Sequence, residues 1–431
     1  MFSMIWSWLK KLMGRNLDAR SPGEPAAGMA KRYSKMGAVN FTAMAANKIA
    51  NVAVSDCSIS VSGDSERAEF LDGEMQRVVS KLKFIATRTL GVGGVILKPW
   101  LYGKSIRVDV LNQERAVVLD RVGDCIKRIA FIADAVEHDG NELVRVEIHE
   151  LDGEIYTIEQ RALRNGREVG LDCVAAWANL PEKQVLEGVD SMLFAWIRCP
   201  IDDRGDGNNL YGVPLTYGCE ALMDEIQMQL DILQNEVVDK RAFIGADFRL
   251  FRSDERGRER LLPGSNIFKK FDAAGGIDDK PFFEVFSPDM RVGQICESVN
   301  FKLALLEKAI GVNRGVLTDL VVGDATATAI KRSTYDTFAL VDAFRVELAD
   351  GLKQLLYAMG VLADLCDLAE NSKPPLPAGE PPFQKGAVAE LVFDWSYGLI
   401  EDNAETFAQL AQGVALGAVN VEELREWLGI G

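Results

Sequence analysis

Histidine is almost absent from this sequence, and most catalytic signatures are absent with it. The chain has only two histidines, His138 and His149, so neither a Ser-His-Asp triad nor a histidine-rich metal site is a convincing interpretation. We interpret both as surface or structural residues. A phosphate-binding loop is missing too: for the run "YGKS" at Tyr102–Ser105, the position that needs the first glycine of a Walker A motif holds Lys98. These absences predict a chain that is not an enzyme and binds no cofactor and no metal.

Paired cysteines and long apolar runs are missing as well. The seven cysteines are scattered and form no Cys-x-x-Cys pair, which favours reduced thiols from a cytosolic site of synthesis over a disulfide framework or a zinc knuckle. No apolar run is long enough to span a bilayer. The start of the chain, Met1–Leu12, is amphipathic but lacks the features of a signal peptide. We expect a partner-docking helix or a frayed end there, with membrane-surface binding as the less favoured alternative.

Positive charge is also in short supply. The net charge is −16 and the isoelectric point is about 4.8. Tight binding to nucleic acid relies on lysines and arginines that release counterions, so the composition argues against it. It does not argue against a protein past which DNA slides, because an acidic wall repels DNA and lets it move. The acidic pairs Asp202-Asp203 and Asp278-Asp279 lie in turn-like contexts without a partner cluster, which disfavours a two-metal nuclease site.

What remains is rich in regular patterns. The 431 residues, 48% of them hydrophobic, suffice for two or three packed domains. Helical periodicity at Phe41–Val54 and Glu66–Leu90 gives way to alternation with period two from Gly94 to Ala176. There, two alternating runs around Asp152-Gly153 predict a β-hairpin. The run "GVGG" at Gly91–Gly94 follows a helix and precedes a strand, the reverse of a dinucleotide-binding loop, and predicts a tight turn.

Three long apolar stripes with helical spacing occupy the second half of the chain. The first begins at Pro214, which suits a first helical turn. The second is preceded by Ser287 as a possible cap and ends at Gly311, and the third covers Ala325–Met359. Three other segments complete the expected order: a small β-rich insertion at Phe243–Ser287, a proline-rich linker at Asn371–Gly386, and a strand at Ala389–Gly398 followed by two short helices.

Five stretches, taken in their order along the chain, are similar to parts of a known family. They are "VEIHELDGEIYTI" at Val146–Ile158, "NNLYGVPLTYGCEALMDEIQMQLDILQNEV" at Asn208–Val237, "LEKAIGVNRGVLTD" at Leu306–Asp319, "DATATAIKRSTYDTF" at Asp324–Phe338, and the run from Phe393 to Gly429. In order, these stretches resemble the wing hairpin, the entry to the first stem helix, the stem-to-tunnel passage, the start of the tunnel helix, and the closing strand and helices of the portal proteins of long-tailed bacteriophages. The fourth stretch departs from the family, because it has "ATAIK" where a glutamate is common.

The resemblance implies an α+β fold, namely a portal fold with a mixed α/β wing, long antiparallel stem helices, a small β-rich clip, a long tunnel helix and a short helical crown. It implies these boundaries: an N-terminal arm at 1–37, the wing at 38–213, stem helix 1 at 214–242, the clip at 243–288, stem helix 2 at 289–311, the tunnel loop at 312–324, the tunnel helix at 325–360, a linker and wing strand at 361–400, and crown helices at 401–431.

The resemblance also implies a function. Portal subunits form a ring, usually of twelve copies, at one capsid vertex; they assemble in the host cytoplasm and stay in the virion. Double-stranded DNA enters through the ring during packaging and leaves through it during ejection. The expected partners are the terminase large subunit, a head-completion adaptor, and the major capsid and scaffold proteins, with no membrane involved. Two other classes stay open: another structural head protein, such as a connector or minor capsid protein, and, less favoured, a metal-dependent nuclease.

The same assignment selects contact residues. Gly311, Gly315 and Gly323 permit backbone bends in the tunnel loop. We expect three sets of contacts. Along the DNA channel, the tunnel loop and helix start contribute Asn313, Arg314, Val321, Val322, Asp324, Thr326, Lys331 and Arg332. The channel face of the first stem helix carries the carboxylates of Asp224, Glu225 and Asp231, and the clip offers Arg256, Arg258 and Arg260 as a docking surface. The alternatives are an ordinary helix-helix connection for the loop and a solvated loop for the arginines.

Overall fold

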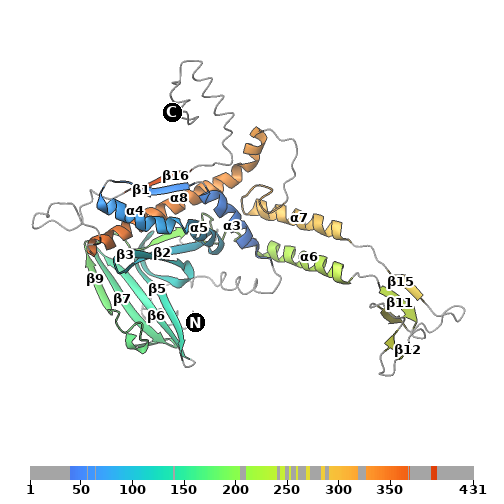
Figure 1. The fold of residues 1–431 in the computed structure, drawn as a ribbon, viewed down its shortest axis with the longest axis horizontal. Helices are drawn as coiled ribbons and strands as arrows, with labels where there is room; N and C mark the ends of the chain where they lie inside the picture. Colours follow the sequence, from blue (N-terminus) through green and yellow to red (C-terminus); the bar gives the residue numbers. More distant parts are fainter. Residues whose placement is uncertain are drawn as a thin grey trace, which may run out of the picture. The chain divides into compact units, whose positions relative to one another are not determined.

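A computed structural model gives the fold of the chain (Figure 1). It describes residues 39–55, 57–63, 65–138, 141–203, 210–239, 243–247, 252–253, 259–260, 268–271, 283–286, 291–318, 327–366, 368 and 390–395. The predicted arm, proline-rich linker and crown helices lie outside these residues. The chain divides into two compact units, one made of Met1–Tyr217 with Ile310–Gly431 and the other of Gly218–Ala309.

The described part of the first unit contains three helices ahead of its sheets of three or more strands. Helix α3 covers Phe41–Val54, with the Asn40 side chain accepting a hydrogen bond from the Ala43 N–H as its N-terminal cap. The helical periodicity expected at Glu66–Leu90 is confirmed, and it is divided between two helices, α4 at Glu66–Val79 and α5 at Leu82–Val92. The apolar spacing continues through the break at Ser80, so it does not mark the boundary between the two helices. The Ser80 hydroxyl donates to the Arg77 carbonyl and so satisfies one of the acceptors at the end of α4.

A short antiparallel sheet follows, with strand order β10-β2-β3. Its strands are β2 at Gly94–Tyr102, β3 at Ser105–Asn112 and β10 at Ala195–Arg198. The expected turn at Gly91–Gly94 is confirmed: α5 ends in a left-handed residue, Gly93, and β2 starts at the next residue. Helix α8, at Ala327–Leu365, packs on β10 and β2.

The larger sheet of the first unit contains the expected hairpin. Its strand order is β4-β5-β6-β7-β8, with β9 also paired to β7, and the three long strands β5, β6 and β7 lie side by side in Figure 1. The hairpin turn at Asp152-Gly153 joins β6 to β7, and Gly153 takes the positive φ of 61° that such a turn needs. The strands are β4 Ala116–Val122, β5 Cys125–His138, β6 Asn141–Asp152, β7 Ile155–Arg164, β8 Arg167–Val169 and β9 Lys183–Glu187.

Both faces of this sheet are covered in its central part. One face carries a cluster that includes Phe131, Leu151 and Tyr156, and the other carries a cluster that includes Val146 and Ile148. Alternation of polar and apolar residues usually marks a strand with one wet face. Here the polar positions of β6 are buried as well, which requires them to find partners inside the protein.

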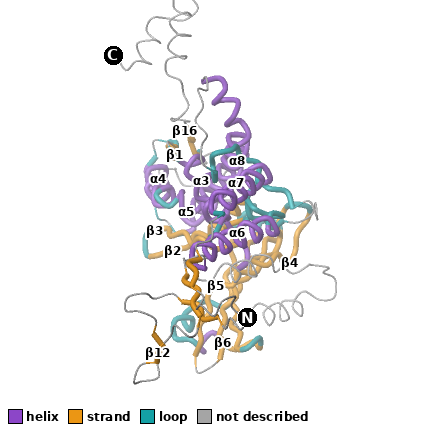
Figure 2. Tube along the Cα trace, turned by 90° about the vertical axis from the view of Figure 1, so that its right-hand side faces the viewer, coloured by secondary structure: helices purple, strands orange, loops and turns teal. Residues whose placement is uncertain are grey.

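Two strands that are far apart in the sequence pair in a two-stranded sheet. Strand β1, at Cys57–Val61, pairs antiparallel with β16, at Leu391–Trp395, within the strand expected at Ala389–Gly398. Helix α4 packs on β1, and α8 packs on β16. In Figure 2 the helices α3, α4, α5 and α8 lie together on one side of the strands β2 to β6.

The second unit consists of two helices with a small β region between them. Helix α6 covers Glu220–Asp239 and α7 covers Val292–Ala309. The start predicted at Pro214 was wrong, because the chain makes turns from Leu215 to Gly218, where Gly218 has a φ of +79°. The β region was expected, and its strands are β11 Phe243–Asp247, β12 Arg252–Ser253, β13 Glu259–Arg260, β14 Phe268–Phe271 and β15 Phe283–Phe286. Strand β11 pairs with β14 in parallel and with β15 antiparallel.

Candidate functional site

Helices α6 and α7 form the pair that the sequence assigns to the stem. The Lys302 ammonium of α7 lies 2.5 Å from a carboxylate oxygen of Glu225 on α6. The Gln229 amide of α6 donates to the Ser298 hydroxyl of α7 at 2.9 Å. Both contacts join the two helices side by side, in the antiparallel hairpin arrangement that the short β region between them allows.

The three carboxylates predicted for the channel lie on the exposed part of α6. Asp224, Glu225 and Asp231 are all exposed. Asp224 and Asp231 are seven residues apart, so both lie on one face of the helix. Glu225 differs from them because its charge is offset by Lys302. The structure therefore separates one carboxylate that joins the helix pair from two that share an outer face.

Exposed apolar side chains occur on both helices of the second unit. On α6 they are Met228 and Ile232, and on α7 they are Phe301, which is 64% exposed, and Leu305. Each couple is spaced by four residues, so each makes a short apolar ridge along its own helix. A solitary helix pair leaves these ridges in water, and a second protein surface would remove them from it.

The segment after α7 holds the described part of the predicted tunnel loop. Gly311 and Gly315 have φ values of +75° and +100°, which agrees with their expected use as bending points. The Asn313 N–H donates to the Thr337 hydroxyl, and the Thr337 N–H donates to the Asn313 side-chain oxygen, each at 2.9 Å. Arg314, next in sequence, is exposed. The contact between Asn313 and α8 was not predicted, because nothing in the sequence marks Thr337 among the other helix residues.

The remaining predicted residues are only partly described. Lys331 and Arg332 belong to α8, and Arg260 belongs to β13, by the path of the backbone. Six predicted contacts lie outside the described residues and stay predictions: Val321, Val322, Asp324, Thr326, Arg256 and Arg258.

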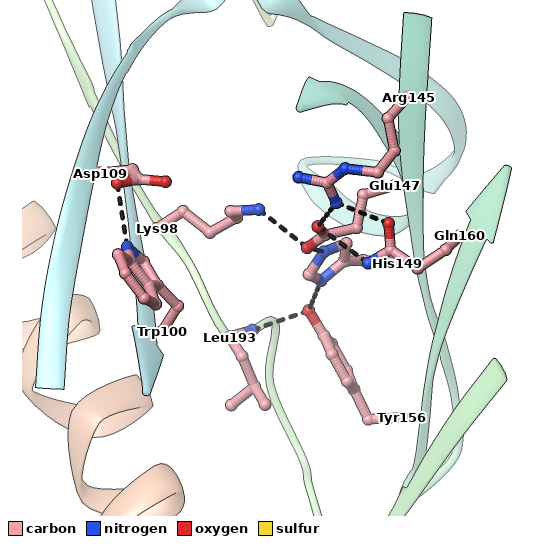
Figure 3. Close-up of polar contacts among 9 residues, drawn as sticks. All are labelled: Lys98, Trp100, Asp109, Arg145, Glu147, His149, Tyr156, Gln160 and Leu193. Carbon is pink, nitrogen blue, oxygen red and sulfur yellow. Dashed lines mark hydrogen bonds and ion pairs between the residues drawn. The ribbon is translucent and has the colours of Figure 1, made fainter. Parts of the chain in front are cut away.

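A buried polar network lies in the first unit, between the small sheet and the large one (Figure 3). The Lys98 ammonium of β2 reaches a Glu147 carboxylate oxygen of β6 at 2.8 Å. Glu147 also accepts from the His149 ring at 2.6 Å. The other ring nitrogen of His149 lies 2.5 Å from the Tyr156 hydroxyl, which accepts from the Leu193 N–H at 3.3 Å.

These contacts fix the protons of the network. Because the Leu193 N–H can only donate, the Tyr156 hydroxyl is free to donate its own proton to His149 Nδ1. Neutral His149 then carries its proton on Nε2 and gives it to Glu147. Burial lowers the pKa of His149, although the hydrogen bond to Glu147 opposes this. Burial by itself would raise the pKa of Glu147, but the contacts with His149 and Lys98 outweigh it and hold the pKa well below its ordinary value.

The connectivity from hydroxyl to imidazole to carboxylate resembles that of a hydrolase triad, but its position excludes that chemistry. His149 is 3% exposed and Tyr156 is 0% exposed, so a substrate cannot reach either group. The network instead joins β2 of one sheet to β6 of the other, which is a structural role for His149. A sequence signal did exist: Arg145, Glu147 and His149 occupy alternate positions of one strand, and Arg145 also contacts Glu147 at 3.4 Å.

Two glycine motifs of the sequence meet in the first unit. A Cβ added at Gly212 would lie 2.0 Å from the Gly93 carbonyl oxygen, and one added at Gly93 would lie 2.4 Å from the Gly212 oxygen. The Gln113 side chain binds both ends of this crossing, donating to the Val92 and Gly212 carbonyls and accepting from the Gly212 N–H. The Gly-Val-Pro run ahead of α6 therefore crosses the "GVGG" turn with backbone directly against backbone.

Two other kinds of site are absent from the described ranges. These ranges contain no group of three or more His, Cys, Asp or Glu residues arranged to hold a metal ion. They also contain no helix that is both long enough and apolar enough to cross a bilayer.

Comparison with known proteins gave structural matches only. No family model matches the chain, and no curated protein matches it. Among solved structures, it is similar to a chain from the virion of a native gene transfer agent particle, with 13% identity, a TM-score of 0.45 and 99% of each chain covered. It is also similar to a chain from the neck of an empty gene transfer agent particle, with 13% identity and a TM-score of 0.46, covering 98% of this chain and 97% of the other.

Proposed function

We propose that the chain is a portal protein: a non-enzymatic subunit of a ring at one capsid vertex, through which double-stranded DNA enters and leaves. The observation that carries the proposal is the second unit, Gly218–Ala309, in which two paired helices enclose a small β region and expose apolar ridges on both helices. The sequence resemblance described above assigns this same segment to the stem and clip of a portal.

The apolar ridges supply a physical reason for a ring. Met228 with Ile232 and Phe301 with Leu305 lie on different helices, and we take them to meet unlike surfaces of neighbouring copies. Contacts between unlike surfaces on identical copies are head-to-tail, and they close into a ring when the rotation per copy permits. The carboxylates of Asp224 and Asp231 would give such a ring a repulsive surface for DNA, whose backbone carries about one negative charge per ~1.7 Å.

The assembled mass of the purified protein tests the proposal, measured by light scattering together with negative-stain images. Twelve copies of the 47.4-kDa chain would give a ring of about 570 kDa with a central hole. The double variant Ile232→Ser/Phe301→Ser should reduce assembly at least ~10-fold, since it removes two apolar side chains worth roughly 1.5–3 kcal/mol each when buried. Val185→Ser, at an exposed valine of β9, is the matched control.

One result would contradict the proposal, and another would contradict only the role of the tunnel loop. The first is a monomer that stays near 47.4 kDa at high concentration and in the presence of scaffold protein, which would favour a minor head protein. The other is a ring whose DNA packaging and retention are unchanged when residues 312–324 are replaced by a short Gly-Ser linker, which would remove the tunnel loop from the mechanism.

A further inference from the structure

A groove opens on the first unit between α4, the start of α5 and the β2–β3 hairpin. Its volume is about 330 Å³, which is room for a few side chains rather than for a large ligand. The lining includes the apolar side chains of Val78, Ile85 and Ile106. Neither the stem nor the tunnel loop contributes to it, so the portal function proposed above does not account for it.

Two aromatic residues stand at the edge of the groove. Tyr102 is 62% exposed, and its ring meets the Trp100 ring edge-on with centroids 5.9 Å apart. The Trp100 indole N–H donates to the Asp109 carboxylate at 2.9 Å (Figure 3), which fixes the orientation of the ring. The Trp100 ring, held in this way, loses little conformational entropy on binding, and aromatic residues are enriched in the buried centres of interfaces.

The charges at the groove select an acidic occupant. The Arg77 guanidinium forms an ion pair with the Glu74 carboxylate, with two hydrogen bonds of 2.9 and 2.7 Å. Lys81 and Arg107 also line the groove, both are exposed, and neither forms an ion pair with another described residue. Asp109 is the second carboxylate of the lining, and its partner, the Trp100 indole, is neutral. With Arg77 and Glu74 paired, two lysine and arginine charges stand against one carboxylate, so the lining keeps one excess positive charge beside an apolar floor, in a chain whose net charge is −16.

Two segments of the chain have the aromatic, apolar and charged residues that an occupant of the groove needs. Met1–Leu12 carries Lys10 and Lys11 and no acidic residue, so the groove would repel it. Asn420–Gly429 carries three glutamates and one arginine, and its sequence predicts a helix capped by Asn420 with Glu423. On such a helix Leu424, Trp427 and Leu428 share one face, because they are spaced by three and four residues.

The second segment can also reach the groove from its own chain. Strand β16 ends at Trp395 and pairs with β1, on which α4 packs, and α4 is one wall of the groove. The residues 396–419 connect Trp395 to the segment. Fully extended, at ~3.3 Å per residue, they span up to ~80 Å. This is several times the ~10–12 Å width of a helix with its side chains, so the connection is long enough to pass α4 and reach the groove.

From these observations we propose that Asn420–Gly429 docks into the groove of its own chain. Trp427 packs against Trp100 and Tyr102, and the glutamates face Lys81 and Arg107. Docking of this kind secures the C-terminal end of the chain to the same unit that β16 joins. The proposal does not depend on the portal function, since every residue it uses belongs to the first unit.

A photo-cross-link in the full-length protein tests the docking. Trp427 is replaced by benzoylphenylalanine, which keeps an aromatic ring, and the linked peptides are identified by mass spectrometry after irradiation. We expect links to peptides that contain 77–81 or 100–110. Lys81→Glu/Arg107→Glu should reduce their yield roughly fivefold, in line with the loss of two exposed ion pairs of up to ~1 kcal/mol each. Adding Glu422→Lys/Glu423→Lys should restore it.

The control pair is Lys48→Glu/Lys83→Glu, which makes the same change of charge at exposed lysines outside the groove lining. An equal loss of yield in this control would overturn the proposal, as would links that map elsewhere in the chain. Mixing isotope-labelled and unlabelled copies separates links within a chain from links between chains. Links found only between copies would assign the groove to a neighbouring subunit and contradict docking within one chain.

Discussion

Asn313 and Thr337 are joined by two hydrogen bonds of 2.9 Å that run in opposite directions between the same two residues. Asn313 follows the last turn after α7, whereas Thr337 lies inside α8. The Asn313 side-chain oxygen accepts a backbone N–H of the helix, so the bond holds the start of the loop onto α8 itself. Losing it would leave the Thr337 backbone N–H to find another acceptor.

The first prediction concerns this link. Asn313→Ala should open the loop and increase the rate of tryptic cleavage after the exposed Arg314 about 3- to 10-fold, since one to two hydrogen bonds are worth ~1 kcal/mol each. Asn313→Asp should cleave like the wild type, because a carboxylate oxygen also accepts the Thr337 N–H. Tyr335→Phe, at an exposed position of the same helix, is the control. Equal cleavage of the alanine and aspartate variants would show that the link does not hold the loop.

The second prediction concerns the glycine crossing. Gly212→Ala would put a Cβ 2.0 Å from the Gly93 oxygen, and because backbone must move to admit it, we expect a loss of at least ~3 kcal/mol or no folded protein. Gly73→Ala is the matched substitution in α4, where an added Cβ meets nothing within 4 Å. It should raise stability by roughly 0.5–1 kcal/mol through helix propensity. Thermal unfolding of both variants checks the pair, and equal effects would contradict the close approach.

The third prediction concerns the pH dependence of the stability of the protein. Burial keeps the pKa of His149 below its ordinary value of about 6.5 in the folded protein, so below about pH 6.5 the unfolded chain binds a proton that the folded chain does not. Stability should fall as pH falls through this range, by at most about 1.4 kcal/mol per pH unit from this group. The lowered pKa of Glu147 acts in the same direction: its stabilisation is present above its unfolded pKa and is lost as pH falls through the folded one.

Urea unfolding of the unassembled protein at pH 5 to 8 measures this dependence. His149→Gln should flatten the slope between pH 5 and 6.5, at the cost of lower stability at pH 7, since the buried contacts with Glu147 and Tyr156 are disturbed. His138→Gln removes the other histidine and is the control. If the slope remains in His149→Gln and disappears in His138→Gln, the pH dependence comes from His138 and the prediction is wrong.

The fourth prediction concerns Arg345 of α8. Its buried guanidinium donates to the carbonyls of Ala53 and Val52 at the end of α3, and it lies 5.2 Å from the centre of the Trp395 ring. Arg345→Ala should therefore cost ~2–4 kcal/mol, because two carbonyl acceptors lose a charged donor and a cavity remains. Hydrogen exchange should accelerate in β1 and β16. Arg345→Lys should recover only part of the loss, because an ammonium lacks the planar fork, and full recovery would contradict the bidentate role.

The fifth prediction follows from the proposed channel. Asp224→Lys/Asp231→Lys would place positive charge on the outer face of α6, and in an assembled ring it should slow DNA passage and increase its dependence on salt. Ring mass should not change, because both residues are exposed. Glu225→Gln is the comparison, since it removes the partner of Lys302 and should affect assembly more than DNA passage. Unchanged packaging rates in the double lysine variant would mean that this face is not the channel.

The sequence by itself determined the secondary structure of the long, periodic segments and the order in which they follow. The hairpin at Asp152-Gly153, the turn at Gly91–Gly94 and the β region between two helices were all predicted, because periodicity, turn chemistry and glycine placement are local properties of the chain. The boundaries were less accurate, as the break at Ser80 and the late start of α6 at Glu220 show, since apolar spacing continues across a helix end.

Only the tertiary structure decided which distant residues meet. The pairing of β1 with β16, the crossing of Gly93 and Gly212, and the link between Asn313 and Thr337 join residues that are far apart in the sequence, and no local pattern encodes such a partner. The network around Glu147 is a further example. Alternation along β6 marked its residues, but the ion pair with Lys98, which the second sheet supplies, is what offsets the free-energy cost of burying the Glu147 carboxylate. Sequence patterns report local geometry, whereas burial and pairing depend on what the rest of the chain brings to each site.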